Sequence, residues 1–264
     1  MRQRKLYLGT NTKMYKTISE TLGYLKELDL LTAGMPETDL ELFVIPSFTT
    51  LESAGRQLKG SKILLGAQNM GWEDRGQFTG EISPLMLKEV GVSIVEIGHS
   101  ERRHVLGETD LQANLKVRCA LEHGFKALLC IGETLEQKEY DLSDEILSTQ
   151  IKIGLYGVNE KQAQQIWIAY EPVWAIGVNG IPATKEYAAQ KHGVIRKVLF
   201  ELFGEKTGLQ IPILYGGSVN PQNAEELIQM PEIDGLFIGR SAWDAENFSK
   251  IIRMVYPLWK GKTV

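Results

Sequence analysis

Residues Ile168 to Gly177 read Ile-Ala-Tyr-Glu-Pro-Val-Trp-Ala-Ile-Gly. The run that leads into them, Ile166–Tyr170, has the length and β-branched content of a buried strand. Glu171 follows, and then Pro172, which lacks the N–H group that a central strand needs. A single carboxylate at the end of a buried strand is poorly hydrated, and it is therefore a stronger base than one in water. The alternative is a hydrated acid on a surface loop, and this stretch alone does not decide between the two.

Short apolar runs recur along the chain, at Leu6–Gly9, Leu42–Ile45, Ile63–Ala67, Ile94–Ile97, Ala127–Ile131, Ile166–Tyr170, Ile213–Tyr215 and Leu236–Ile238. Segments with helical periodicity lie between them, such as Thr17–Leu31, Thr49–Leu58, Leu111–His123, Lys185–Phe203 and Asn223–Gln229. This alternation favours a parallel sheet with helices packed outside it. Eight strands at roughly thirty-residue spacing predict an α/β fold of the (β/α)8 or TIM-barrel type. The alternative is an open doubly wound sheet, but its Gly-x-Gly-x-x-Gly fingerprint is missing after the first strand.

Composition narrows the class of protein. The 264 residues are 43% apolar and 23% charged, with a formal net charge of −4. We find no linker or low-complexity tract and expect one domain over residues 1–264. The mild acidity offers no general attraction for nucleic acid or for a membrane, and no run approaches the ~18 apolar residues of a membrane span. The first apolar run is too short for a signal peptide, and two cysteines make no disulfide framework, which favours a cytoplasmic setting.

Polar residues follow the predicted strands, which is where the active sites of such barrels lie. They are Asn11-Thr12-Lys13, Gln68-Asn69, Gly98-His99-Ser100-Glu101-Arg102-Arg103, Gly132-Glu133, Glu171, Gly216-Gly217-Ser218 and Gly239-Arg240. One lysine, one histidine and one glutamate thus converge with two glycine-rich turns, whose backbone N–H groups can hold a phosphate. No cluster of cysteine and histidine has the spacing of metal ligands, so we expect no metal site.

These segments resemble the motifs of the triosephosphate isomerase family in order and across nearly the whole chain. The matches are Asn11-x-Lys13, Gly98 to Arg103, Ala169 to Gly177 and Tyr215-Gly216-Gly217-Ser218-Val219. The resemblance implies that Glu171 is the base, which takes a proton from the carbon beside a carbonyl and returns it one carbon away. It implies that neutral His99 and the Lys13 ammonium stabilise the enediolate oxygen. Asn11 is expected to position Lys13 and that oxygen.

The resemblance also implies the binding residues and partners. Gly177, Ser218 and Gly239 match the positions that hold the substrate phosphate, and Glu101 is expected to pair with Lys13 or to order its loop. The substrate is then a small phosphorylated sugar, with no cofactor. The long loop Met70 to Gly80, which carries Trp72 and Phe78, is expected to insert into a second subunit of a homodimer. Thr79 would then lie near the partner's active site.

Three segments depart from the usual family pattern. The lid continues Gly177-Val178-Asn179-Gly180-Ile181-Pro182, one residue longer than usual, with a tight turn expected at Asn179-Gly180. Thr12 stands where the family usually has tryptophan, and Gly239-Arg240 replaces a Gly-Gly turn. Together with Thr79 to Lys88, these features resemble the branch of the family that acts on erythrulose 1-phosphate. A longer lid, the smaller Thr12 and the added donor Arg240 are expected to accommodate the extra hydroxymethyl group of that substrate.

Three hypotheses follow. The first is an isomerase that converts L-erythrulose 1-phosphate to D-erythrulose 4-phosphate, an intramolecular oxidoreductase of the aldose-ketose type, expected in erythritol catabolism. The second is triosephosphate isomerase, which acts on dihydroxyacetone phosphate in glycolysis and gluconeogenesis. The third is a non-catalytic barrel that binds a phosphorylated metabolite. The joint presence of Asn11, Lys13, His99 and Glu171 argues against the third.

Overall fold

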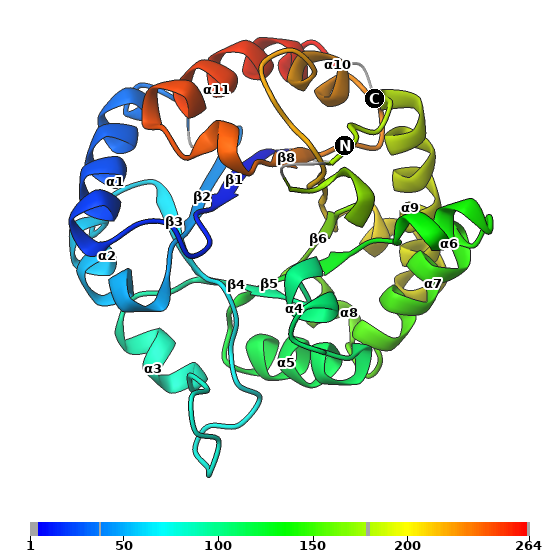
Figure 1. The fold of residues 1–264 in the computed structure, drawn as a ribbon, viewed down its shortest axis with the longest axis horizontal. Coiled ribbons are helices and arrows are strands. Elements are labelled where there is room, and N and C mark those ends of the chain that lie inside the picture. The colour runs from blue at the N-terminus through cyan, green and yellow to red at the C-terminus, as the bar shows by residue number, and fades with distance from the viewer. Residues whose placement is uncertain (1–4, 37, 178–179, 263–264) are drawn as a thin grey trace.

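Eight parallel strands form a closed barrel, and their spatial order is their order along the chain (Figure 1). The computed structural model describes residues 5–36, 38–177 and 180–262. The strands are β1 (Leu6–Asn11), β2 (Leu40–Ile45), β3 (Ile63–Ala67), β4 (Ile94–Ile97), β5 (Lys126–Ile131), β6 (Ile166–Tyr170), β7 (Ile213–Tyr215) and β8 (Gly235–Phe237). Because β8 pairs with β1, the barrel is closed, and the predicted TIM barrel is confirmed over the open sheet.

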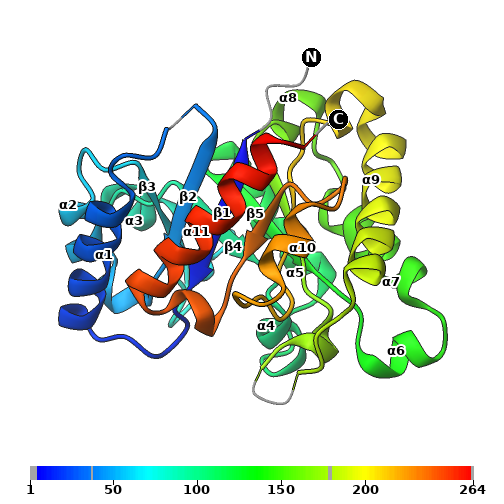
Figure 2. The same ribbon diagram turned by 90° about the horizontal axis from the view of Figure 1, so that it is seen from above.

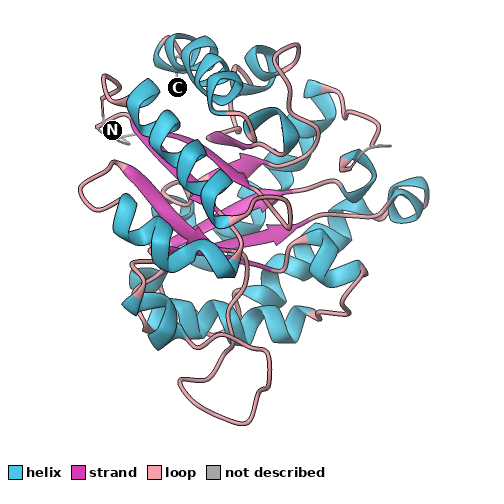
Figure 3. Cartoon of the chain, turned by 60° about the vertical axis from the view of Figure 1, so that its left-hand side comes forward, coloured by secondary structure: helices cyan, strands magenta, loops and turns pink. Residues whose placement is uncertain are grey.

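Helices surround the barrel, and strands lie inside the ring (Figures 1, 2 and 3). The α-helices are α1 (Ile18–Thr32), α2 (Leu51–Gln57), α3 (Pro84–Glu89), α4 (Ser100–His104), α5 (Asp110–Glu122), α6 (Leu135–Glu139), α7 (Ser143–Gly154), α8 (Glu160–Ala163), α9 (Lys185–Gly208), α10 (Ala224–Ile228) and α11 (Ala245–Lys260). Three short 3₁₀ turns are η1 (Phe48–Thr50), η2 (Val173–Ala175) and η3 (Arg240–Ala242).

Local sequence explains where several helices begin and end. Thr17 accepts a hydrogen bond from the Glu20 amide while the Glu20 side chain accepts from the Thr17 amide, and this capping box starts α1. The expected helix Lys185–Phe203 is longer in the structure, because the chain resumes helical geometry after a break at Gly204 and ends at Gly208. Gly204 has a φ of 74°, which a glycine adopts without steric cost.

Alternation along each strand separates two apolar layers. In β2, Leu42 and Val44 face the helices, whereas Phe43 and Ile45 belong to a second cluster inside the barrel. Successive strand residues point to opposite faces of a sheet, so every other residue is inside. The interior is filled by side chains: a Cβ atom added to Gly9 would lie 2.2 Å from the Phe43 ring. The barrel is therefore a packed core that supports a site at one end.

Among the described residues, no helix is both long enough and apolar enough to cross a lipid bilayer.

Candidate active site

A pocket of about 790 Å³ opens where the carboxyl ends of the strands meet. Every site residue predicted from sequence lines it except Thr79: Asn11, Lys13, His99, Glu101, Glu171, Gly177, Ser218, Gly239 and Arg240. These residues are far apart along the chain, and the closed barrel brings them together because parallel strands all end at the same rim.

Glu171 follows β6 directly and is only 2% exposed, so the alternative of a hydrated surface acid is wrong. Its Oε1 lies 3.5 Å from Nε2 of His99, and its Oε2 accepts a hydrogen bond from the Ser100 amide at 3.4 Å. Two glycines make room for it. A Cβ atom at Gly216 would lie 2.9 Å from Cγ of Glu171, and one at Gly132 would lie 1.9 Å from its carbonyl oxygen. The Glu171 carboxylate is thus held in a tight, largely dry position at the pocket wall.

His99 is the N-cap residue of α4, and its Nδ1 accepts a hydrogen bond from the Glu101 amide at 3.2 Å. An imidazole nitrogen that accepts from a backbone N–H carries no proton, so the neutral ring has its hydrogen on Nε2. Nε2 is the nitrogen that faces Glu171, on the pocket side. This geometry is the one that a neutral hydrogen-bond donor requires.

Lys13 has a φ of 51°, a left-handed conformation that costs energy for a residue other than glycine. Its amide donates to Oδ1 of Asn11 at 2.6 Å, and its carbonyl accepts from Gln68 Nε2 at 2.8 Å and from Ser47 Oγ at 2.9 Å. These bonds hold the strained backbone in place. The Lys13 ammonium lies 2.5 Å from Oε1 of Glu101. Glu101 therefore pairs with Lys13, which is the first of the two roles expected for it.

The sequence reasoning missed Glu96, which lies beneath these residues. It is an inward-facing residue of β4, fully buried, and its Oε2 accepts a hydrogen bond from Asn11 Nδ2 at 2.6 Å. The sequence feature that could have revealed it is a single acid inside the apolar run Ile94–Ile97, at a position that strand alternation directs into the barrel.

The lid after Glu171 is anchored at its start. Trp174 donates from Nε1 to Glu133 Oε1 at 2.9 Å, and Tyr170 and Tyr187 also donate to this buried carboxylate. The expectations for Val178 and Asn179, the extra lid residue and the tight turn, lie outside the described residues.

The two glycine-rich turns that are expected to bind phosphate, at Ser218 and at Gly239, both line the pocket. Gly239 precedes η3, whose first amides have no partner within the turn, as at any helix start. Arg240 donates from Nη2 to the Gly177 carbonyl oxygen at 3.3 Å, which connects the end of β8 to the lid. The pocket therefore combines one guanidinium with exposed backbone N–H groups, a set suited to an anion.

Thr12 does not act as expected. Its side chain is buried and does not line the pocket, so its small size does not widen the pocket directly. Trp243 does line the pocket: it donates from Nε1 to the Asn11 carbonyl oxygen at 2.8 Å and packs on Tyr15 at 4.5 Å between ring centroids. An indole from the β8 side thus covers the β1 loop.

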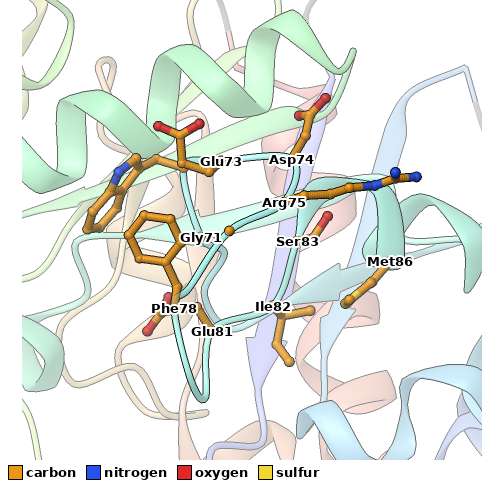
Figure 4. Close-up of a pocket in the computed structure, with 11 residues that line it drawn as sticks. Gly71, Glu73, Asp74, Arg75, Phe78, Glu81, Ile82, Ser83 and Met86 are labelled. Carbon is orange, nitrogen blue, oxygen red and sulfur yellow. The ribbon is translucent and has the colours of Figure 1, made fainter.

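Thr79 lies on the loop between β3 and α3, which projects away from the barrel (Figure 3). The Gly71 amide closes the base of this loop by donating to the Ile82 carbonyl oxygen at 2.8 Å. A smaller pocket, of about 240 Å³, lies within the loop, and the Phe78 ring forms part of its wall (Figure 4). It contains none of the predicted catalytic residues, so we assign the chemistry to the larger pocket.

Two groups of possible metal ligands occur among the described residues. They are Asp74, Cys119 and His123 near the projecting loop, and Glu96, His99 and Glu171 in the barrel. In each group the ligand atoms lie within 4.8 Å of one another. Both histidines are already engaged, His123 between Asp74 and the Cys119 carbonyl, and His99 with the Glu101 amide.

Known proteins resemble this chain over nearly its whole length. The family model described as triosephosphate isomerase matches residues 6–255. A protein named L-erythrulose-1-phosphate isomerase from Rhizobium etli is 48% identical over 95% of this chain and 92% of the relative. A protein of the same name from Rhizobium meliloti is also 48% identical, over 97% of this chain and 98% of the relative. A third protein of this name, from Brucella abortus, is 47% identical over 94% of this chain and 95% of the relative.

A solved structure agrees in fold. The crystal structure of triosephosphate isomerase from Bartonella henselae superposes with a TM-score of 0.85 and 37% identity, covering 95% of this chain and 98% of the other. The match of fold, sequence and family model spans the barrel and every strand that contributes to the pocket. This chain belongs to the triosephosphate isomerase family.

Proposed function

We propose that this protein interconverts L-erythrulose 1-phosphate and D-erythrulose 4-phosphate through an enediolate. The observation that carries the proposal is the 3.5 Å approach of the Glu171 carboxylate to Nε2 of His99 at the wall of a pocket that Arg240 also lines. A base and a neutral donor so placed can act on adjacent atoms of one substrate.

In the proposed mechanism, Glu171 removes the proton from C3 of L-erythrulose 1-phosphate, and the electron pair moves toward the C2 carbonyl oxygen. His99 donates a hydrogen bond to the developing oxyanion, and the Lys13 ammonium adds positive charge beside it. Glu171 then returns the proton to C2, and the hydroxyl hydrogen of the C3 oxygen passes to the C2 oxygen through Nε2 of His99, so the C3 oxygen becomes the carbonyl. The hydrogens move within one molecule, so the reaction consumes no external oxidant, and we propose that it uses no cofactor.

Two features support a four-carbon substrate. The curated relatives at 47–48% identity carry the erythrulose-phosphate name, whereas the solved triosephosphate isomerase is 37% identical. Arg240 and Trp243 add polar groups and bulk to the pocket on the β8 side. The substrate differs from dihydroxyacetone phosphate by one hydroxymethyl group on the carbon that loses the proton, and a polar pocket discriminates strongly at such a group.

The second candidate is triosephosphate isomerase, which the solved relative favours because it shares this fold and family. A direct comparison separates the two. Purified protein is assayed with both ketose phosphates, with Glu171→Gln as a blank for contaminating isomerase. We expect kcat/KM for L-erythrulose 1-phosphate to be at least ~10-fold higher. Turnover of dihydroxyacetone phosphate near the diffusional ceiling of ~10⁸ M⁻¹s⁻¹ would instead favour glycolysis.

We further propose that the protein acts as a cytoplasmic homodimer in erythritol catabolism. The projecting loop exposes 44% of Phe78, an aromatic surface that a second subunit can cover. In such a dimer, Thr79 would approach the pocket of the partner subunit.

A further inference from the structure

Glu96 is an ionisable side chain sealed inside the barrel. Strand alternation in β4 directs Ile94 and Glu96 inward, and Glu96 lies above the apolar layer and below the pocket floor. Its carboxyl has no exposed surface, and it does not line the pocket. A buried charge of this kind is costly, so its environment must either neutralise it or pair it.

The polar neighbours of Glu96 lie on, or directly after, β1, β4, β5 and β6. Asn11 of β1 donates to its Oε2 at 2.6 Å, and its Oε1 lies 3.9 Å from Sγ of Cys130 on β5 and 4.0 Å from Nε2 of His99. Glu171 after β6 is the nearest second acid, with carboxylate atoms of the two within 4.8 Å. No cation contacts Glu96 among the described residues, because the Lys13 ammonium is directed to Glu101.

The hydrogen bonds of Asn11 establish which oxygen of Glu96 can carry a proton. The Asn11 Oδ1 accepts from the Lys13 amide and from Gln68 Nε2, so the other amide atom, Nδ2, must be the one that faces Glu96. Nδ2 can only donate, which makes Oε2 of Glu96 an acceptor. Oε1 receives only the weak Cys130 thiol donor, at 3.9 Å, so we place a proton of Glu96 on Oε1, on the side of Cys130 and His99.

Electrostatics favours such a proton. Burial raises the pKa of Glu96 well above its ordinary range, and the negative charge of Glu171 raises it further. Lys13 acts in the opposite direction, Glu101 adds to the rise, and the Asn11 hydrogen bond lowers the pKa slightly. Two carboxylates this close in a dry site cannot both ionise readily.

We propose that Glu96 is a further positioning residue of the site: a protonated carboxylic acid that fixes the Asn11 amide. The inference rests on the proposed function, because Asn11 and Glu171 serve that reaction. The acid holds Nδ2 of Asn11 toward the barrel axis and Oδ1 toward the Lys13 loop. That loop has a strained backbone at Lys13, so the orientation of Asn11 determines where the ammonium lies.

Two substitutions of Glu96 separate this role from simple packing. Glu96→Gln imitates the neutral acid and keeps an acceptor for Asn11, whereas Glu96→Leu has similar volume and no acceptor. We expect Glu96→Gln to keep kcat within about tenfold of wild type and Glu96→Leu to lose about 10²-fold, the scale of a small misplacement of catalytic groups. The loss should appear in kcat more than in KM, because Glu96 does not touch the pocket. Equal kinetics of the two variants would overturn the proposal.

The double variant Asn11→Ala/Glu96→Leu tests whether Glu96 influences turnover through Asn11. If Glu96 acts through Asn11, the double variant is no slower than Asn11→Ala alone, and the losses are not additive. Additive losses would overturn the proposal.

The protonation state is measured without substrate. The infrared difference spectrum of wild type minus Glu96→Gln at neutral pH should contain the carbonyl band of a protonated carboxylic acid. Bands of an ionised carboxylate in its place would overturn the proposal, whichever ketose phosphate the enzyme prefers. Failure of the wild type to turn over L-erythrulose 1-phosphate, in contrast, would overturn the proposed function and leave this measurement standing.

Discussion

The Arg240 guanidinium donates a hydrogen bond to the carbonyl oxygen of Gly177 at 3.3 Å, and both residues line the pocket. The contact places a positive charge beside the phosphate turn and links that turn to the lid. Arg240→Ala should therefore raise KM for the phosphorylated substrate by about tenfold, the value of one hydrogen bond to a charged group. Arg56→Ala, which removes an exposed arginine on α2, is the matched control and should leave KM unchanged. An unchanged KM in Arg240→Ala would exclude Arg240 from substrate binding.

Glu171→Gln should abolish proton transfer while preserving the shape of the pocket. We expect kcat to fall by orders of magnitude, because an amide cannot accept the proton, and calorimetric binding of a phosphate ligand to remain close to wild type. Glu139→Gln on the exposed face of α6 controls for the loss of one charge. Activity within tenfold of wild type would remove Glu171 from the mechanism.

His99 should be neutral with its hydrogen on Nε2, because Nδ1 accepts from the Glu101 amide. Nitrogen-15 NMR of labelled protein near neutral pH distinguishes the two neutral tautomers from imidazolium. A doubly protonated ring would contradict the assigned role of His99 as a neutral donor.

The projecting loop should mediate dimerisation. Phe78 is 44% exposed and packs against Trp72 at 5.8 Å between ring centroids. Phe78→Asp places a charge where the second subunit would lie, so we expect monomers in light scattering and a loss of activity. Tyr156→Asp changes an aromatic residue that is 76% exposed elsewhere, and it should remain dimeric. A wild-type monomer with full activity at nanomolar concentration would refute the prediction.

His192 should make the protein less stable in mild acid. Burial lowers its pKa from 6.5 to about 4, because the charged ring cannot be hydrated inside the fold. The unfolded chain therefore binds a proton first, and stability is complete above pH 6.5 and is lost progressively as the pH falls toward 4. The loss amounts to at most about 3 to 4 kcal/mol. Denaturant titrations of wild type and His192→Gln at several pH values should show a shallower acid slope in the variant; parallel slopes would contradict this.

The alternation of strands and helices, and the polar motifs that follow the strands, could be predicted from the sequence because both are patterns of neighbouring residues. Short apolar runs such as Leu6–Gly9, and the acid after Tyr170, are visible without any tertiary contact, and the strands observed differ from those predicted by at most two residues at either end. The predicted end of the helix at Phe203 agrees with the break at Gly204, whereas the helical segment that follows this glycine and completes α9 was not predicted.

The sequence by itself determined the barrel, the rim position of Glu171, His99 and Lys13, and the family, because periodicity and motif order are properties of the chain alone. Only the tertiary structure decided what surrounds them. It placed Glu96 under Asn11, put Trp243 rather than Thr12 at the pocket, and joined Arg240 to Gly177. These contacts join residues up to 232 positions apart, and they depend on how individual side chains pack once the barrel has closed, which no local pattern encodes.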